Sequence, residues 1–188
     1  MKDKTSIPEW GPISEEEYWE RIDYLLKNIV PVAEEYKVRL ACHPQDPYTP
    51  PGYKGVVRVL GTVEGMKKFV LMHESKYHGI NFCQGTICEM LENPKTEIFD
   101  VIKWFGERKK IFNVHFRNIV GKKLAFEETF PDEGDIDMFK AAQAYKEVGY
   151  EYMLMPDHTP KISGPDPNNI SFAFCYGYIK AIIQAINQ

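Results

Sequence analysis

Helical and extended apolar patterns alternate along the chain. An amphipathic pattern predicts a helix at about 14–36, with Ser14 as its N-cap and Glu17 at the capping-box position. Short apolar runs predict four strands, at 38–42, 77–82, 111–116 and 150–155. A helical pattern follows each strand, at 63–74, 94–108, 136–148 and 171–186. This order, one helix and then four strand–helix units, predicts parallel strands joined by helical crossovers.

The predicted fold is therefore α/β and resembles a TIM barrel with half of its strands. A closed barrel of this type has eight strand–helix units and typically about 250 residues, whereas this chain has 188 residues and four predicted units. We expect one domain, 1–188, that forms a half or incomplete barrel. Because the edges of such a sheet are open, we also expect a homo-oligomer or association with a missing half-barrel.

Composition and charge narrow the classes of function. The chain is 44% hydrophobic and 27% charged, which is typical of a globular protein. Its net charge of −4 and the lack of a basic block argue against nucleic acid or an anionic membrane as a partner. No apolar run approaches the roughly 20 residues that span a bilayer. The polar N-terminus lacks a signal core, so a cytoplasmic location is expected.

Each predicted strand ends near a residue that can bind a metal ion. These residues are His43, Cys83, His115 and Asp157, about one strand–helix unit apart. Since the carboxyl ends of parallel strands meet at one edge of the sheet, we expect the four side chains to lie together. Imidazole, thiolate and carboxylate groups suit a divalent transition ion such as Mn²⁺, Fe²⁺ or Zn²⁺. Taken singly, each residue has a plainer interpretation as a hydrogen-bonded histidine, a buried cysteine or a turn aspartate.

Polar residues near these strand ends are further candidates. Arg117 lies two positions after His115, so both side chains should share one face of the strand. A guanidinium there is suited to binding a carboxylate. The acidic pair Glu127–Glu128 could orient a substrate hydroxyl, although a solvated acidic loop is the simpler interpretation. His73 and His78 are expected at the opposite end of the sheet, both solvated.

Five ordered motifs resemble those of the mannonate dehydratase family, and more loosely those of the wider group of divalent-metal sugar isomerase-like barrels. The resemblance runs from about Lys37 to Gln184 and corresponds to the C-terminal half of a family member. It implies a xylose isomerase-like barrel. The motifs are His43-Pro44-Gln45-Asp46-Pro47, Phe82-Cys83-Gln84-Gly85-Thr86, His115-Phe116-Arg117-Asn118, Gly134-Asp135-Ile136-Asp137-Met138 and Pro156-Asp157-His158.

The resemblance also implies roles for individual residues. A divalent metal, Mn²⁺ or Fe²⁺, would be held by His43, Cys83, His115 and Asp157. His158 would act as the acid or base. Arg117 would hold the substrate carboxylate or an adjacent hydroxyl, and the remaining polar motif residues expected to bind substrate are Gln84 and Asn118.

The activity implied is that of a lyase that dehydrates the sugar acid D-mannonate to 2-keto-3-deoxy-gluconate. Two alternatives remain open: a metal-dependent sugar isomerase or epimerase, and a non-catalytic half-barrel fragment or subunit that binds metal. The chain departs from the family pattern at Glu127-Glu128 and Pro131, where members often carry a His-Glu pair and a further histidine. The segment 172–178 has no clear counterpart of a catalytic tyrosine found in some members, and the first half of the barrel is absent.

Overall fold

Four parallel strands form the central sheet of the protein. The computed structural model describes residues 11–188. The strands β1 (Leu40–Cys42), β2 (His78–Cys83), β3 (Ile111–His115) and β6 (Leu154–Met155) lie in the order β1-β2-β3-β6, and every neighbouring pair is parallel. The predicted parallel α/β arrangement is therefore confirmed. In the described part of the chain the sheet does not close, because β1 and β6 each pair on one side only.

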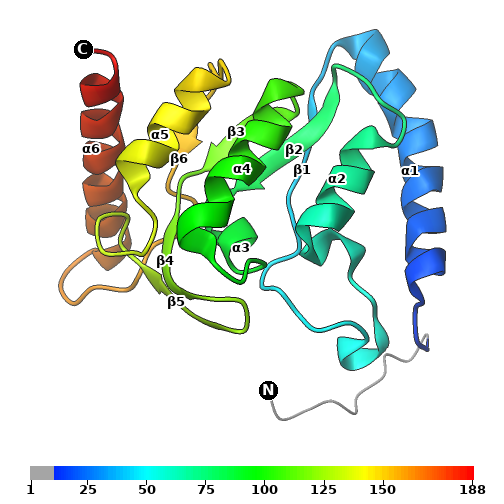
Figure 1. Cartoon of the computed structure of the whole chain (residues 1–188), viewed down its shortest axis with the longest axis horizontal. Helices are drawn as coiled ribbons and strands as arrows, with labels where there is room; N and C mark the ends of the chain where they lie inside the picture. The colour runs from blue at the N-terminus through cyan, green and yellow to red at the C-terminus, as the bar shows by residue number, and fades with distance from the viewer. Residues whose placement is uncertain (1–10) are drawn as a thin grey trace.

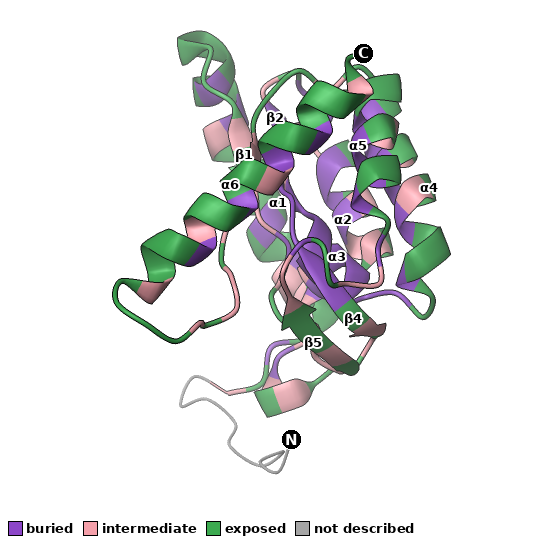
Figure 2. Cartoon of the chain, turned by 90° about the vertical axis from the view of Figure 1, so that its left-hand side faces the viewer, coloured by how far each residue is buried: buried purple, intermediate pink, exposed green. Residues whose placement is uncertain are grey.

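Helices cover one face of this sheet. Figure 1 shows α2, α4 and α5 in front of the strands, with α1 and α6 at the two sides. The helices are α1 (Glu15–Tyr36), α2 (Val63–Leu71), α4 (Pro94–Glu107), α5 (Met138–Glu147) and α6 (Pro167–Ile186). Buried residues lie on the strands and on the sides of the helices that face them (Figure 2). The largest fully buried ones include Phe82 of β2, Phe105 of α4 and Tyr145 of α5.

The helix α1 begins where its capping signal predicted. The Ser14 hydroxyl accepts a hydrogen bond of 3.2 Å from the backbone N–H of Glu17, which satisfies one of the free donors of the first turn. The helix ends at Tyr36, and Lys37 follows in the left-handed conformation at φ 56°. The inward face carries the buried residues Trp19, Ile22, Leu26, Val30 and Ala33. The predicted range 14–36 is confirmed to within one residue.

Two local elements were not predicted from the sequence. A short helix α3 (Gln84–Cys88) follows β2 directly, and a hairpin of β4 (Asn118–Lys122) and β5 (Ala125–Thr129) follows β3. The hairpin lies beside α3 (Figure 1). The pairing of its strands depends on Gly121 of β4 at φ 102°, where an added Cβ would lie 2.2 Å from the carbonyl oxygen of Ala125. The polar sequence of this hairpin lacks the apolar alternation that identifies a strand.

The amino-terminal end of the sheet corrects one prediction. His78 was expected to be solvated, but it is 1% exposed and its Nε2 lies 3.0 Å from the carbonyl oxygen of Phe69. Burial lowers the pKa of His78, with the charge of Lys110 acting in the same direction. His73 is exposed as predicted, and its Nε2 lies 2.8 Å from Asp23 Oδ1.

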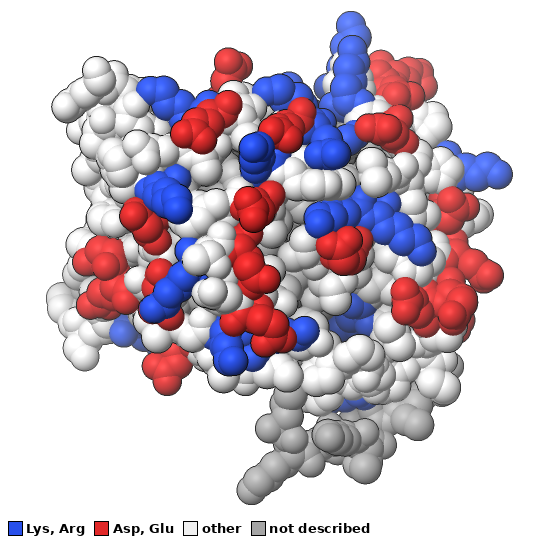
Figure 3. All heavy atoms as spheres, in the orientation of Figure 1, with Lys and Arg blue, Asp and Glu red and all other residues white. Residues whose placement is uncertain are grey.

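The two open edges of the sheet leave apolar side chains uncovered. Val38, just before β1, is 56% exposed, and Met153, just before β6, is 59% exposed. On the face shown in Figure 3, lysine and arginine are interspersed with aspartate and glutamate, so no large area of one sign forms there. Within residues 11–188, no helix combines the length and the apolar character needed to cross a membrane.

Candidate metal centre

The four strand-end residues meet at one point of the structure. His43, Cys83, His115 and Asp157 each offer one ligand atom, and these atoms all lie within 4.8 Å of one another. Cys83 and His115 are register partners on β2 and β3, while His43 follows β1 and Asp157 follows β6. The parallel sheet brings the four together because all of its strands end at the same edge.

In each of the two histidines, one ring nitrogen lies within hydrogen-bonding distance of another protein group. The Nδ1 of His43 lies 2.7 Å from the carbonyl oxygen of Pro44, so its Nε2 is left for a ligand. The Nε2 of His115 lies 2.8 Å from Asn81 Nδ2. The other nitrogen of His115, Nδ1, is buried without a hydrogen-bond partner. It lies 3.1 Å from Asp157 Oδ2, but that contact lacks hydrogen-bonding geometry.

The unpartnered nitrogen is a sign that the site fits a metal ion. A buried polar atom without a partner is costly, and a cation between His115 Nδ1 and the Asp157 carboxylate would satisfy both. Asp157 adopts the left-handed conformation at φ 66°, which costs a residue other than glycine about 1 kcal/mol. Two nitrogens, one sulfur and one carboxylate oxygen form a donor set suited to a divalent transition ion.

The Cys83 sulfur is surrounded by hydrogen-bond donors. Cys83 is fully buried, and its Sγ accepts a hydrogen bond of 3.3 Å from Arg117 NH1. Thr86 Oγ1 lies 3.0 Å from Cys83 Sγ and 2.8 Å from Asp46 Oδ2, and its single proton goes to one of the two. These donors take the place of water around a metal-binding thiolate.

Arg117 is the cation at the centre of this cluster. Its side chain is 3% exposed. NH1 lies 3.2 Å from Asp46 Oδ2, and NH2 pairs with Glu128 Oε1. Protein carboxylates thus contact both of these amino groups, and the role of Arg117 in holding a substrate carboxylate stays a prediction. Gly85 makes the arrangement possible, since a Cβ there would lie 2.9 Å from Arg117 Cβ.

His158 stands beside the cluster and faces solvent. Its side chain is 46% exposed. Nδ1 lies 3.2 Å from Glu128 Oε1, and Nε2 lies 3.4 Å from Asp157 Oδ2. A carboxylate on each side orients the imidazole ring, as a residue that transfers protons requires. The structure therefore places His158 next to the predicted ligands and accessible to a small molecule.

The predicted substrate-binding residues Gln84 and Asn118 are both buried and hydrogen-bonded within the protein. Gln84 is fully buried; its amide donates to the carbonyl oxygen of Arg117 and accepts from the Tyr145 hydroxyl. Asn118 is 2% exposed. Its Nδ2 donates to the carbonyls of Pro131 and Ile136, and its Oδ1 accepts from the N–H groups of Ile119 and Ile136. Both amides are scaffold residues that use their polar atoms inside the protein.

Sequence reasoning missed several residues of the site. Glu128 was interpreted as part of a solvated loop, but the hairpin carries it to Arg117 and His158. Two others, Asp46 and Thr86, stood inside the recognised motifs and were given no role. Glu89 follows α3 and lies fully buried, with NH2 of Arg117 3.6 Å from its Oε1. No periodic signal marks any of them, because their partners lie on other segments of the chain.

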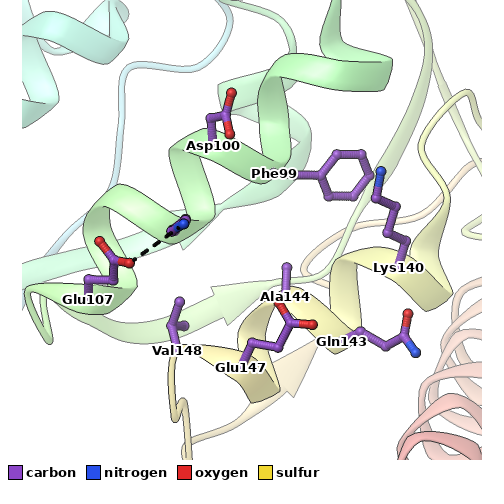
Figure 4. A pocket seen from close by; sticks show the side chains of 9 residues that line it. Phe99, Asp100, Glu107, Lys140, Gln143, Ala144, Glu147 and Val148 are labelled. Carbon is purple, nitrogen blue, oxygen red and sulfur yellow. Dashed lines mark ion pairs between the residues drawn. The ribbon is translucent and has the colours of Figure 1, made fainter.

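A separate groove lies on the helical side of the molecule. It has a volume of about 360 Å³ and lies between α4 and α5, with Phe99, Lys103 and Lys140 among its lining residues. Figure 4 shows these side chains and the Lys103–Glu107 ion pair. No residue of the metal cluster lines this groove. It is a surface furrow between adjacent helices.

Comparisons with known sequences point to one family. A family model described as D-mannonate dehydratase (UxuA) matches residues 1–187. A mannonate dehydratase of Thermotoga petrophila is 34% identical over 155 residues, which cover 81% of this chain and 42% of that protein. One from Streptococcus uberis is 33% identical over 158 residues, with 82% and 44% covered. The chain spans less than half the length of these relatives.

Solved structures show the same relationship. The mannonate dehydratase of Streptococcus suis serotype 2 superposes with a TM-score of 0.81 at 30% identity, covering 93% of this chain and 50% of that one. A D-tagatose 3-epimerase-like protein reaches a TM-score of 0.67 at 23% identity. A xylose isomerase domain protein from Planctomyces limnophilus reaches 0.66 at 13% identity. The two lower identities establish the fold alone, and the expected xylose isomerase-like half-barrel is confirmed.

Proposed function

Because the chain belongs to the D-mannonate dehydratase family, we propose that it provides the metal-binding half of a hydro-lyase that converts D-mannonate into 2-keto-3-deoxy-gluconate and water. The observation that carries this proposal is the convergence of His43, Cys83, His115 and Asp157 within 4.8 Å, with His158 beside them.

The proposed reaction removes one water molecule across two carbons. The C2–H bond next to the carboxylate and the C3–O bond break, and a C2=C3 double bond forms. The hydroxyl leaves with a proton as water, and the enol that remains becomes the 2-keto acid. A divalent ion held by the four ligands would stabilise the negative charge that develops on substrate oxygens.

His158 is the chain's own group for proton transfer in this proposal. Its accessible ring can take a proton from the substrate or give one to the leaving hydroxyl, and histidine is the commonest residue in that role. Glu128, 3.2 Å from Nδ1, would hold the ring's orientation and stabilise the protonated form. Asp157 would serve the metal ion and contact the other side of the ring.

Substitution of His158 tests this assignment. Removal of a general acid or base typically costs a factor of 10²–10⁴ in rate, so His158→Asn should lower kcat for mannonate dehydration by about 100-fold or more. His73→Asn is the matched control, because His73 is exposed outside the cluster and pairs with Asp23. Equal turnover in the wild type and His158→Asn would refute the role. Absence of turnover in metal-loaded wild type would refute activity of this chain by itself.

Product analysis separates dehydration from the rival chemistry. The dehydratase should form a 2-keto-3-deoxy acid from mannonate and leave free ketoses unchanged. Formation of an epimeric or isomeric sugar from a ketose would favour a sugar isomerase or epimerase instead.

We propose Mn²⁺ or Fe²⁺ as the ion, which metal analysis of protein purified without added metal would identify.

The open sheet edges lead to a proposal about assembly. Val38 and Met153 are exposed beside β1 and β6, and unpaired strand edges readily add further strands. We propose that these edges associate with another half-barrel, either a second copy or a separate chain. Light scattering coupled to size-exclusion chromatography should give a mass above that of the monomer. A monomer at all concentrations would refute self-association.

A further inference from the structure

One guanidinium is surrounded by more acidic groups than it can neutralise. The carboxylates of Asp46 and Glu128 contact Arg117 directly, and Oε1 of Glu89 lies 3.6 Å from its NH2. Oδ2 of Asp157 lies 3.8 Å from NH1. Asp157 belongs to the metal cluster, where a cation would offset its charge. Three carboxyl groups are then left around the guanidinium, and the exposed His158 lies beside the two outer ones, 3.2 Å from Glu128 and 4.0 Å from Asp46, and not beside Glu89.

These three carboxyl groups differ in their access to water. The side chains of Asp46 and Glu128 are 30% and 37% exposed, so solvent stabilises their charged forms. Glu89 is fully buried, and neither of its oxygens has a hydrogen-bond partner. A buried carboxylate without donors is strongly disfavoured relative to its neutral acid. The proton that this cluster must retain therefore belongs on Glu89.

We propose that Glu89 is a positioning residue that stays protonated in the folded protein, so that Arg117 remains directed at Asp46, Glu128 and the Cys83 sulfur. A charged Glu89 would attract NH2 and compete with Glu128 for it. The guanidinium would then turn away from the metal ligand Cys83 and from the β4–β5 hairpin that carries Glu128. Neutral Glu89 thus maintains the connection between hairpin and metal centre.

The charges around Glu89 act in the direction that this proposal requires. Burial, the largest cause, and the carboxylates of Asp46 and Glu128 together raise the pKa of Glu89, which comes to about 8. Arg117 opposes them. The backbone of Tyr48 also lowers the pKa of Glu89, although less than Arg117 does, and the neighbouring Cys88 is a buried thiol. No other carboxylate or cation is known to face it in residues 11–188.

The first test compares Glu89→Gln with the wild type across pH. Glutamine is close in shape to a protonated glutamate, so both proteins should have similar unfolding temperatures at pH 5. As the pH rises from about 5 to about 8, the wild type should lose stability relative to Glu89→Gln, and above about pH 8 the difference should stay level. Glu147→Gln is the matched control, because Glu147 is an exposed carboxylate outside the cluster, and it should follow the wild type.

The outcomes distinguish the two possible states of Glu89. Parallel pH profiles of wild type and Glu89→Gln would overturn the proposal. So would a loss of stability in Glu89→Gln that grows as the pH rises through about 4.5, because it would show that a charged Glu89 is paired with Arg117. Failure of Glu89→Gln to fold would have the same meaning, since a neutral isostere should be tolerated.

A second test measures the metal site without any substrate, so its result is independent of the proposed dehydratase activity. Cobalt(II) serves as the probe, and the absorption band of a thiolate–cobalt bond reports binding at Cys83. Affinities of the wild type and Glu89→Gln should agree at pH 6.5, whereas at pH 9 the variant should bind about 10-fold more tightly, the size of a typical effect from residues behind the ligands. Equal affinities at both pH values would contradict the coupling to the metal centre.

Discussion

Replacing Asn118 by alanine should destabilise the fold rather than act on substrate binding. Asn118 makes four hydrogen bonds inside the protein, joining the start of β4 to the residues before α5. At a net value of about 1 kcal/mol for each bond, Asn118→Ala should lower the free energy of unfolding by about 4 kcal/mol. This is a large share of the roughly 5–15 kcal/mol that holds a typical domain together.

Urea denaturation followed by circular dichroism measures this loss. Asn28→Ala is the control, because Asn28 is an exposed asparagine of α1 with a single hydrogen bond to the carbonyl oxygen of Tyr24, and its effect should stay within about 0.5 kcal/mol. A variant too unstable to purify would agree with a large loss. The reasoning would be refuted if Asn118→Ala unfolded at the wild-type urea concentration while its affinity for mannonate fell, because that result would restore the substrate role.

Three further predictions concern the metal centre and its acidic surroundings. Mn²⁺ at 100 times its dissociation constant should stabilise the wild type by about 2.7 kcal/mol in urea denaturation; an equal gain in His43→Ala would exclude this ligand set. Cys83→Ser should lower the affinity for the metal ion, measured by titration calorimetry, by about 10-fold or more. An unchanged affinity would exclude Cys83 as a ligand. Glu89 has its pKa raised from 4.5 to about 8, so the folded state keeps a proton that the unfolded chain releases. The contribution of Glu89 to the free energy of unfolding should therefore be full below about pH 4.5 and fall by up to about 5 kcal/mol towards about pH 8. If the difference in unfolding free energy between the wild type and Glu89→Gln stayed constant across this window, the assignment would be contradicted.

The sequence predicted the main elements because their signals are local. The capping residues Ser14 and Glu17 predict the start of α1, and the apolar runs before Cys83 and His115 predict β2 and β3. The last strand was predicted at 150–155, but it covers only Leu154 and Met155. A strand at an open edge has hydrogen-bonding partners on one side alone, so its length depends on a neighbour rather than on its own apolar run.

The same local signals placed the metal ligands but not their surroundings. Once the strands are parallel, residues at their carboxyl ends must meet, and this sufficed to bring His43 and Asp157 together. The hairpin that carries Glu128 has no such pattern. Its contact with Arg117 joins segments that the sequence gives no reason to pair.

By itself, the sequence determined the order of the main helices and strands and the four candidate ligands at the strand ends, because both follow from periodicity and chain direction. Only the tertiary structure decided what the polar residues beside those ligands do. Asn118 proved to be a scaffold residue and Arg117 a cation shared among protein carboxylates. Burial and hydrogen bonding depend on which distant segments come close, and for Glu89 they determine even whether the side chain carries a charge.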